Sequence, residues 1–488
     1  MKLLVARLLV GLLVATATAT TAPPTGGSGS GGETRSANKH NTKHGFTHGQ
    51  DVLILDSPSH DFVGDTQPYR FHKIVRIPCA EPFCSKESFQ SLLQNSMAVV
   101  SVLSWTSKHV DVQINTVVDP ASVLPFLSGV SVLVDDVQDL VDREMNRLAL
   151  SQAAFASLDM ESLFAPDVWF SDYHKYDQIV AWFKDLSDKF PDLITFIPSI
   201  GKTYLKKDII GIKVGSSVNA DTKPQFWFHS GDHAREWIGP ATVQFLVHNL
   251  VTEYASNPTL LDSTELIIVP LMNVDGYEHT WSGNRLWRKN RRPIKKDFFG
   301  SVGVDLNRNW PAHWGEGGSS SYPFSDTYMG PSAGSEPEVQ SLISFFKNDN
   351  HTRLIGAIDF HSFSQLILRP YGWTEERAPD EKHLKTAGDG IRDAIKRVSG
   401  KKYVSEREID LYAASGTASD WFYDEEVQEW LPDRRLYAYT IELRPSADEA
   451  NGANGFILPP DQIVPTGQEI LAAVKYYLDY ARKNPLKV

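Results

Sequence analysis

The chain has 488 residues, of which 41% are hydrophobic, 22% charged and 11% aromatic. This composition is typical of a globular protein of two or three domains and excludes collagen-like, coiled-coil and wholly disordered chains. The net charge is −12 and no long basic run is present, so we expect no nucleic-acid partner, because phosphate binding requires clustered lysine and arginine. Two cysteines cannot form a disulfide scaffold or a cysteine-rich metal site.

The first 21 residues have the pattern of a secretory signal peptide. Lys2 and Arg7 precede an apolar core at 8–14, and small residues follow up to Ala19, as such a leader requires. The protein is therefore expected to be secreted, although a vacuolar destination stays open. No later stretch reaches the length of a membrane-spanning segment, so no membrane association is expected. Asn350 begins an N-glycosylation triplet, and the sequence leaves open whether it is occupied.

Residues 22–60 form a low-complexity polar segment that is predicted to be disordered, because it cannot bury enough apolar surface to offset the entropy of ordering. His40, His44 and His48 are spaced by four within it. This spacing allows a metal site on a helix, but Gly45 and the flanking Gly/Ser tract favour a solvated tail.

Residues 61–148 are predicted to form a small α+β domain. The expected order is β-α-β-β-α-β, the split βαβ pattern, and Cys79 and Cys84 in its first loop either form a disulfide or remain buried thiols. The predicted strands are Phe71–Ile77, Val99–Trp105, Val110–Val117 and Val130–Val134.

A helix along 137–148 is expected to lead into a connecting segment at 149–165. Arg143 and Arg147 lie on this exposed-looking connector, where an activating protease could cut.

Residues 166–488 alternate between strand and helix patterns and are predicted to form one α/β domain, a mixed, mostly parallel twisted sheet flanked by helices. Amphipathic helices are expected around 179–186, 243–250 and 470–478. The predicted strands are Ile209–Val214, Phe226–Phe228, Leu266–Leu271, Leu354–Phe360 and Tyr437–Leu443.

Candidate metal ligands follow two of these strands. His233 and Glu236 lie three residues apart after the strand at 226–228, and His361 follows the strand at 354–360. Imidazole nitrogen and carboxylate oxygen are usual zinc ligands, and a catalytic zinc takes three protein ligands and a water molecule. Asp232, or a backbone carbonyl, is a candidate to orient a ligating imidazole.

Further polar side chains occur on later loops and on the last strand. Arg288, Asn307 and Arg308 follow the strand at 266–271, and arginine recognises a carboxylate through two parallel hydrogen bonds, as a substrate with a free C-terminus would require. Strand alternation places Glu442 on the face opposite Tyr439 and Ile441, which makes it a candidate general base.

Taken together, these motifs resemble the zinc metallocarboxypeptidases of the pancreatic carboxypeptidase A/B type, including fungal secreted members, over residues 66–485. The matching motifs are His233-Ala-Arg-Glu236-Trp, Asn284-Arg-Leu-Trp-Arg288-Lys, Asp305-Leu-Asn307-Arg308-Asn-Trp, His361-Ser-Phe-Ser-Gln, Tyr412-Ala-Ala-Ser-Gly and Thr440-Ile-Glu442-Leu-Arg.

The resemblance implies a role for each matching residue and a peptide or protein C-terminus as substrate. His233, Glu236 and His361 would bind one Zn²⁺. The other roles would be Glu442 as general base and acid, Arg288 as oxyanion stabiliser, Asn307 and Arg308 as binders of the terminal carboxylate, Arg235 along the approach and Tyr412 as a cover over the substrate.

The resemblance also implies that residues 61–148 are an inhibitory propeptide, that an activating protease releases it, and that the protein is a monomer. The position that forms the specificity-pocket floor in the family is occupied by Ser419, which favours no class of C-terminal residue. Arg407, if it lies on the pocket wall, could admit acidic ends. We predict an uncharged, A-like preference, because no carboxylate was identified in the pocket.

Two other readings stay open. Residues 330–334 match the G-x-S-x-G pattern of serine hydrolases, but the preceding stretch is loop-like. The second alternative is a catalytically inactive relative that acts in binding or cell-wall assembly. The retention of Glu442, Arg288 and Arg308 argues against it.

Overall fold

The computed structural model describes residues 69–78, 99–106, 108–115, 129–294, 300–348, 351–450 and 455–487. The predicted signal peptide and low-complexity segment, the two helices of the predicted β-α-β-β-α-β order, Cys79, Cys84 and Asn350 lie outside the described residues. None of the helices in the described part is both long and apolar enough to cross a membrane.

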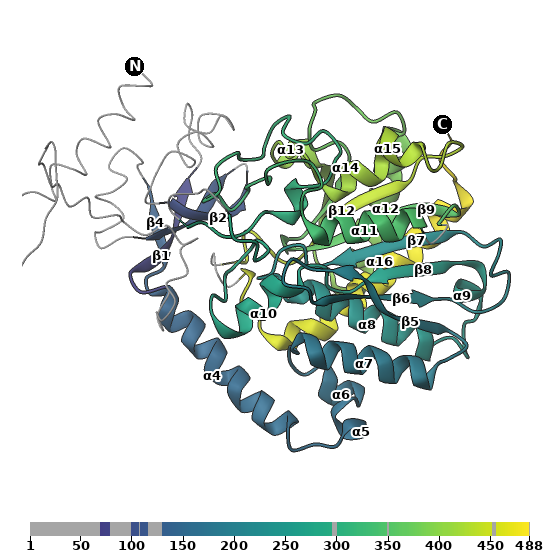
Figure 1. Ribbon diagram of the computed structural model, residues 1–488, viewed down its shortest axis with the longest axis horizontal. Coiled ribbons are helices and arrows are strands. Elements are labelled where there is room, and N and C mark those ends of the chain that lie inside the picture. Colours follow the sequence, from purple (N-terminus) through teal and green to yellow (C-terminus); the bar gives the residue numbers. More distant parts are fainter. Residues whose placement is uncertain are drawn as a thin grey trace, which may run out of the picture.

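A four-stranded antiparallel sheet lies at the N-terminal side, with the strand order β2-β3-β1-β4 (Figure 1). All four strands expected there are present, displaced by one or two residues at most. Their bounds are β1 His72–Pro78, β2 Val99–Trp105, β3 His109–Asn115 and β4 Ser131–Val134.

Both faces of strand β3 are buried, which the alternation of apolar and polar residues did not predict. Val110 and Val112 are buried on one face, and Asp111 and Gln113 are also buried on the other. The polar face is covered because it packs against the rest of the chain: Arg76, paired with Asp111 at 2.7 Å, donates further hydrogen bonds to the carbonyls of Ala447 and Ala450.

The connector is helical rather than extended. Helix α4 runs from Val137 to Phe155, beyond the expected end at 148, and short helices α5 (Met160–Leu163) and α6 (Pro166–Trp169) follow (Figure 1). The helix predicted at 137–148 therefore continues for seven more residues into the segment predicted as a connector. Repeated alanine and leucine residues favour helix there, and Phe155 and Leu163 are buried against the large domain.

The large domain is built on an eight-stranded sheet with the order β11-β10-β12-β9-β7-β8-β6-β5. The central pairs β12–β9, β9–β7 and β7–β8 are parallel, as is β10–β11, whereas β5–β6, β6–β8 and β10–β12 are antiparallel. The bounds are β5 Ile194–Lys202, β6 Asp208–Val214, β7 Gln225–Ser230, β8 Glu265–Val269, β9 Leu354–Ser364, β10 Leu366–Arg369, β11 Val404–Arg407 and β12 Tyr437–Ser446.

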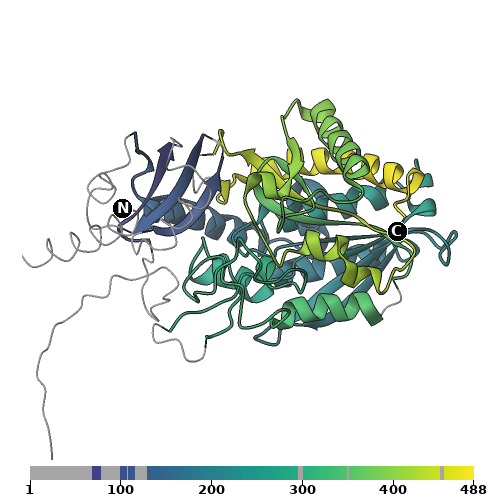
Figure 2. The same cartoon turned by 90° about the horizontal axis from the view of Figure 1, so that it is seen from above.

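Helices cover both faces of this sheet, so its central strands are buried on both sides. Helices α8, α12 and α16 pack side by side on one face, and α11 and α14 lie on the other (Figure 2). The bounds are α7 Tyr176–Lys189, α8 Ile238–Thr252, α9 Thr259–Ser263, α10 Val274–Ser282, α11 Pro337–Asn348, α12 Glu381–Ser399, α13 Glu408–Leu411, α14 Ala418–Tyr423, α15 Glu425–Gln428 and α16 Ile463–Lys483.

This topology brings the ends of three parallel strands together. In β7, β9 and β12 the carboxyl ends lie at one edge of the sheet, which is where open α/β sheets place ligands. The candidate residues at 233–236, 361 and 442 all belong to this edge.

Candidate active site

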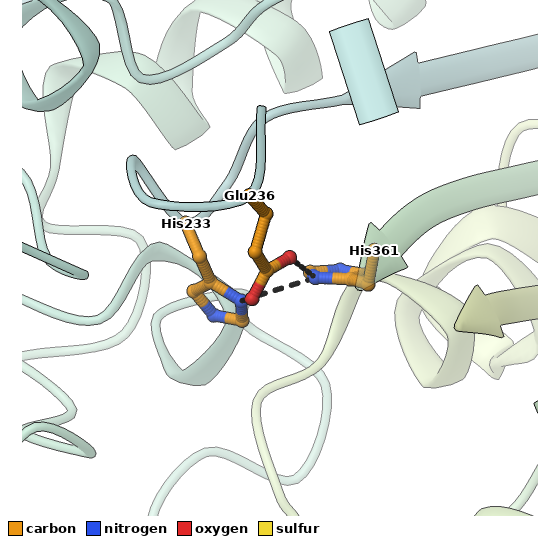
Figure 3. Close-up of side chains that lie close together, drawn as sticks. All are labelled: His233, Glu236 and His361. Atoms are coloured by element: carbon orange, nitrogen blue, oxygen red, sulfur yellow. Dashed lines mark hydrogen bonds and ion pairs between the residues drawn. The ribbon is translucent and has the colours of Figure 1, made fainter. Parts of the chain in front are cut away.

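The three predicted metal ligands converge on one point (Figure 3). Donor atoms of His233, Glu236 and His361 all lie within 4.8 Å of one another. Glu236 Oε1 lies 2.8 Å from His233 Nδ1, Glu236 Oε2 lies 3.0 Å from His361 Nδ1, and the two Nδ1 atoms are 3.0 Å apart. His233 and Glu236 lie on the turn between β7 and α8, and His361 lies inside β9, which continues to Ser364 because β12 pairs with it.

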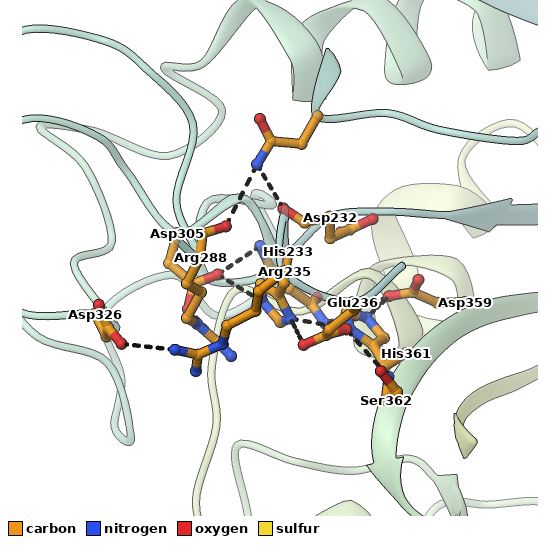
Figure 4. A network of polar contacts seen from close by, with 12 residues as sticks. Asp232, His233, Arg235, Glu236, Arg288, Asp305, Asp326, Asp359, His361 and Ser362 are labelled. Carbon is orange, nitrogen blue, oxygen red and sulfur yellow. Dashed lines mark hydrogen bonds and ion pairs between the residues drawn. The ribbon is translucent and has the colours of Figure 1, made fainter. Parts of the chain in front are cut away.

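Each imidazole is oriented by a buried aspartate on its other nitrogen (Figure 4). His233 Nε2 lies 3.0 Å from Asp305 Oδ1, and His361 Nε2 lies 2.5 Å from Asp359 Oδ2. Burial opposes ionisation of both aspartates, but Arg288 beside Asp305 and the histidines beside Asp359 outweigh it and lower both pKa values. Ionised carboxylates accept, so each Nε2 carries the hydrogen.

The resulting donor set fits a bound cation. With hydrogen on both Nε2 atoms, the two Nδ1 lone pairs face each other beside a carboxylate, an arrangement that is repulsive unless a positive charge lies between them. Burial opposes protonation of His361, but the neighbouring carboxylates of Asp359 and Glu236 raise its pKa above the usual value. Two imidazoles and one carboxylate are the donors of a catalytic zinc site.

Arg288 and Glu442 flank this donor set. Arg288 donates to Asp305 Oδ2 at 2.8 Å, so Asp305 holds both the guanidinium and the His233 ring. Glu442 pairs with His361 in the β12–β9 register, and its Oε2 atom has no hydrogen-bond partner in the described part of the chain. Burial raises the pKa of Glu442 to about 8, against the positive charges of His361 and Arg288.

The residues predicted to bind a substrate carboxylate lie beside the metal ligands. Asn307 Nδ2 lies 3.0 Å from His361 Nε2, and Asn307 Oδ1 accepts from the Ala418 amide at 2.8 Å. The Arg308 guanidinium lies 5.9 Å from the centre of the half-buried Tyr412 ring. Asp305, which caps the short 3₁₀ turn at 306–308, fixes both residues relative to His233.

Ser419 lies close to this group and contacts an acidic side chain. Its hydroxyl donates to Glu408 Oε2 at 2.7 Å. No carboxylate was identified at this position from the sequence, whereas the structure places the Glu408 carboxylate against Ser419; the uncharged preference stays a prediction. Arg407 pairs with Asp410 at 2.6 Å, so its charge is already compensated.

Arg235 is covered by the N-terminal sheet. Its Nη1 atom donates to Ser101 Oγ at 3.1 Å, and Ser101 in turn donates to Asp326 at 2.5 Å. The Arg235 guanidinium also lies over the Phe456 ring, at 4.2 Å from its centre. Arg235, predicted to lie along the approach of the substrate, therefore contacts β2 rather than solvent.

Sequence reasoning named Asp232 as a candidate to orient an imidazole, but Asp305 and Asp359 take that role. Asp232, His229 and Asp359 form a second buried group of metal-ligand type. However, Trp227 Nε1 donates to His229 Nδ1, so the Nε2 hydrogen faces Asp359 Oδ1 at 3.3 Å. His229 therefore supports Asp359 rather than a second metal ion. The sequence spacing of Trp227 and His229 does not predict the contact between His229 and Asp359.

The serine-hydrolase alternative is contradicted. Ser332 is exposed on a loop, and no strand precedes it directly, whereas a nucleophile elbow joins a strand to a helix at the serine.

Comparison with known proteins agrees with this geometry. Residues 179–473 match the family model described as zinc carboxypeptidase. The chain is 32% identical to mouse carboxypeptidase A4 over 78% of its length and 87% of that protein, and 36% identical to a metallocarboxypeptidase A-like protein of Trichophyton verrucosum over 64% and 71%. The structure of a carboxypeptidase A from Helicoverpa armigera superposes with a TM-score of 0.73 at 28% identity, covering 85% of this chain and 98% of that one.

The chain therefore belongs to the zinc carboxypeptidase family. It is a zinc-dependent metallocarboxypeptidase, and its cofactor is one zinc ion.

Proposed function

We propose that this chain is a secreted zymogen whose active form removes single residues from the C-termini of peptides and proteins, with the residue roles predicted from the sequence. The observation that carries this proposal is the convergence of His233, Glu236 and His361 beside Arg288, Asn307 and Glu442. The ion, when bound, polarises the scissile carbonyl and makes water a stronger acid. Substrate binding, proton transfer and stabilisation of the oxyanion are assigned to side chains of this chain.

Substrate anchoring explains why only the last peptide bond is cut. Asn307 and Arg308 bind the free terminal carboxylate, and Asn307 is itself 3.0 Å from the ring of His361. This places the last peptide bond, and no other, beside the metal ligands. Tyr412, next to Arg308, covers the bound residue and excludes water.

Proton transfer is assigned to Glu442. It accepts a proton from the attacking water and delivers it to the leaving amine, and a pKa near the working pH suits both directions. Arg288 stabilises the developing oxyanion, and its position is fixed by the 2.8 Å contact with Asp305. Loss of one such donor typically costs about 3–4 kcal/mol of transition-state stabilisation.

The variant Glu442→Gln tests this function and separates an enzyme from an inactive binding protein. Release of the last residue from an N-blocked dipeptide should fall by about 10²–10⁴-fold, with zinc still bound by elemental analysis. A chelator should abolish wild-type activity, and zinc should restore it. No release of any C-terminal residue by the proteolysed wild-type protein would contradict the proposal.

The N-terminal sheet supports the zymogen part of the proposal. Tyr69, Ile74 and Leu103 share a buried apolar cluster with Leu286 and Phe363, which lie two residues from Arg288 and His361. The hydroxyl of Tyr69 accepts from the Leu286 amide at 2.6 Å. A sheet held there obstructs the approach to the site.

Ion pairs fix this arrangement. Glu144 on α4 pairs with the buried Arg285 at 2.6 Å, so the helix that carries the connector is attached to the site loop. Breaking a buried pair by removing one partner typically costs 3–5 kcal/mol. Release of the N-terminal unit is therefore expected to require cleavage of the chain.

Cleavage between 143 and 165 should raise kcat/KM toward a small N-blocked dipeptide. Arg143 and Arg147 are within α4, so a protease needs local unfolding of that helix. If intact protein hydrolyses the substrate as fast as the cleaved protein, the zymogen proposal is wrong while the carboxypeptidase activity stands.

A further inference from the structure

The side chain of the substrate's last residue must lie close to the Glu408–Ser419 pair. Asn307, which binds the terminal carboxylate under the proposed function, accepts a hydrogen bond from Ala418 N, and Ser419 follows directly. The side chain of a C-terminal residue branches from the carbon that bears this carboxylate. Helix α14 therefore begins close to the position expected for that side chain.

Glu408 is directed into this region from the short helix α13. Only 6% of the residue is exposed, and its Oε2 atom accepts from Ser419 at 2.7 Å. On the other side, a Cβ atom added to Gly372 would lie 2.9 Å from Glu408 Cδ. The bare backbone of Gly372 thus leaves the room that the carboxylate occupies.

The charge of Glu408 has no cationic partner of its own. Among the residues that the structure describes, no lysine or arginine forms an ion pair with it, and Arg407 on the preceding strand is bound to Asp410. Burial raises the pKa of Glu408, whereas the Ser419 hydroxyl and the charge of Arg308 oppose the rise. A cation placed against this carboxylate would keep it ionised.

A second polar group lies on the face of β12 that carries Glu442. Thr440 lies two residues before Glu442 on β12, so strand alternation puts both on one face. The Thr440 Oγ1 atom is buried and has no hydrogen-bond partner within the described part of the chain. A carboxylate, a serine and a free threonine hydroxyl form a wall suited to N–H donors rather than to an aromatic or aliphatic group.

We infer that Glu408 is a specificity-determining residue and that the enzyme prefers substrates ending in lysine or arginine. This inference rests on the proposed function and replaces the expected uncharged preference. The negative charge is carried by Glu408. Ser419, at the pocket-floor position, carries no charge and holds the Glu408 carboxylate through its hydroxyl.

The test compares kcat/KM of the proteolysed enzyme on N-blocked dipeptides that differ only in a C-terminal lysine, arginine, phenylalanine or leucine. The wild-type enzyme should favour the basic ends. In Glu408→Gln the ratio of kcat/KM for lysine over phenylalanine should fall about 30-fold or more, as for loss of one partner of a buried charge pair. Ser419→Ala should lower the ratio less.

Glu375→Gln is the matched control, because it removes one negative charge from a side chain that is 86% exposed; its ratio should stay at the wild-type value. A wild-type preference for phenylalanine or leucine overturns the inference without needing any variant. Equal losses on all four substrates in Glu408→Gln, with unchanged thermal unfolding, also overturn it. Absence of hydrolysis of every substrate would instead contradict the proposed function.

Discussion

Each imidazole of the predicted metal site lies against one buried carboxylate. Asp359 contacts three polar side chains: His361 at 2.5 Å, Asn307 at 3.3 Å and His229 at 3.3 Å. Its negative charge fixes the Nε2 hydrogen of His361 and makes the Nδ1 lone pair a better metal donor.

Asp359→Asn should therefore weaken zinc binding about 10–100-fold, because the amide can still accept from His361 but has lost the charge. Competition with a fluorescent chelator measures the zinc Kd. Asp410→Asn, on a partly exposed side chain remote from the ligands in sequence, should bind zinc like the wild type. An unchanged Kd in Asp359→Asn would show that the aspartate contributes only packing.

Residues that act through a short motif were predictable, and residues that act through a distant partner were not. His233 and Glu236 are three residues apart, and the structure brings them together with His361 as expected. Asp305 reaches His233 across 72 positions of sequence, and the contact between Glu408 and Ser419 depends on the turn between α13 and α14. No spacing rule encodes these tertiary contacts.

At the scale of elements, apolar runs identified the central strands because such strands are buried on both faces. β7 and β9 were found in this way. The edge strands β5 and β11 were missed because they are half-exposed and therefore carry weak patterns, and the internal strand β10 was missed because it has only four residues. The end of the helix before the connector was also predicted too early, since α4 continues seven residues beyond position 148.

The N-terminus of α4 gives a test at this scale. The Asp136 side chain caps the helix by accepting from Asp139 N at 3.0 Å. Asp136→Ala should destabilise the helix by about 1 kcal/mol and raise the rate of tryptic cleavage at Arg143 about fivefold, if cleavage follows local opening.

Asp135→Ala is the neighbouring control. Asp135 is exposed and forms only a surface ion pair with Lys73, and such pairs contribute about 0–1 kcal/mol. Its cleavage rate should lie closer to the wild type. Equal rates in both variants would mean that opening of α4 does not begin at its first turn.

For the whole molecule, the decisive feature is the polar face of the N-terminal sheet buried against the large domain. Asp111 and Gln113 alternate with apolar residues along β3, a pattern typical of a strand with one face in water, yet both are buried. A sequence pattern reports which residues share a face of a sheet, but not what covers that face. Buried titratable groups in this interface make its stability sensitive to pH.

His72 is such a group. It is 4% exposed, and its Nδ1 atom accepts from Gln113 Nε2 at 2.7 Å, a bond that protonation of Nδ1 would abolish. Burial lowers its pKa to about 4 from the ordinary 6.5. A histidine with a lowered folded-state pKa binds its proton mainly in the unfolded state, so its contribution to stability is complete above pH 6.5 and decreases as the pH falls toward 4.

The N-terminal sheet should therefore lose about 2 kcal/mol of stability between pH 6.5 and 5 through this residue. Hydrogen exchange of the β1 and β3 amides at the two pH values, corrected for intrinsic rates, measures the loss. His72→Asn retains an acceptor for Gln113 without titrating, so its exchange should vary less with pH. His383→Asn, at an exposed position of α12, is the control and should show the pH dependence of the wild type. If His72→Asn also shows that pH dependence, His72 is not the acid-sensitive contact of the sheet.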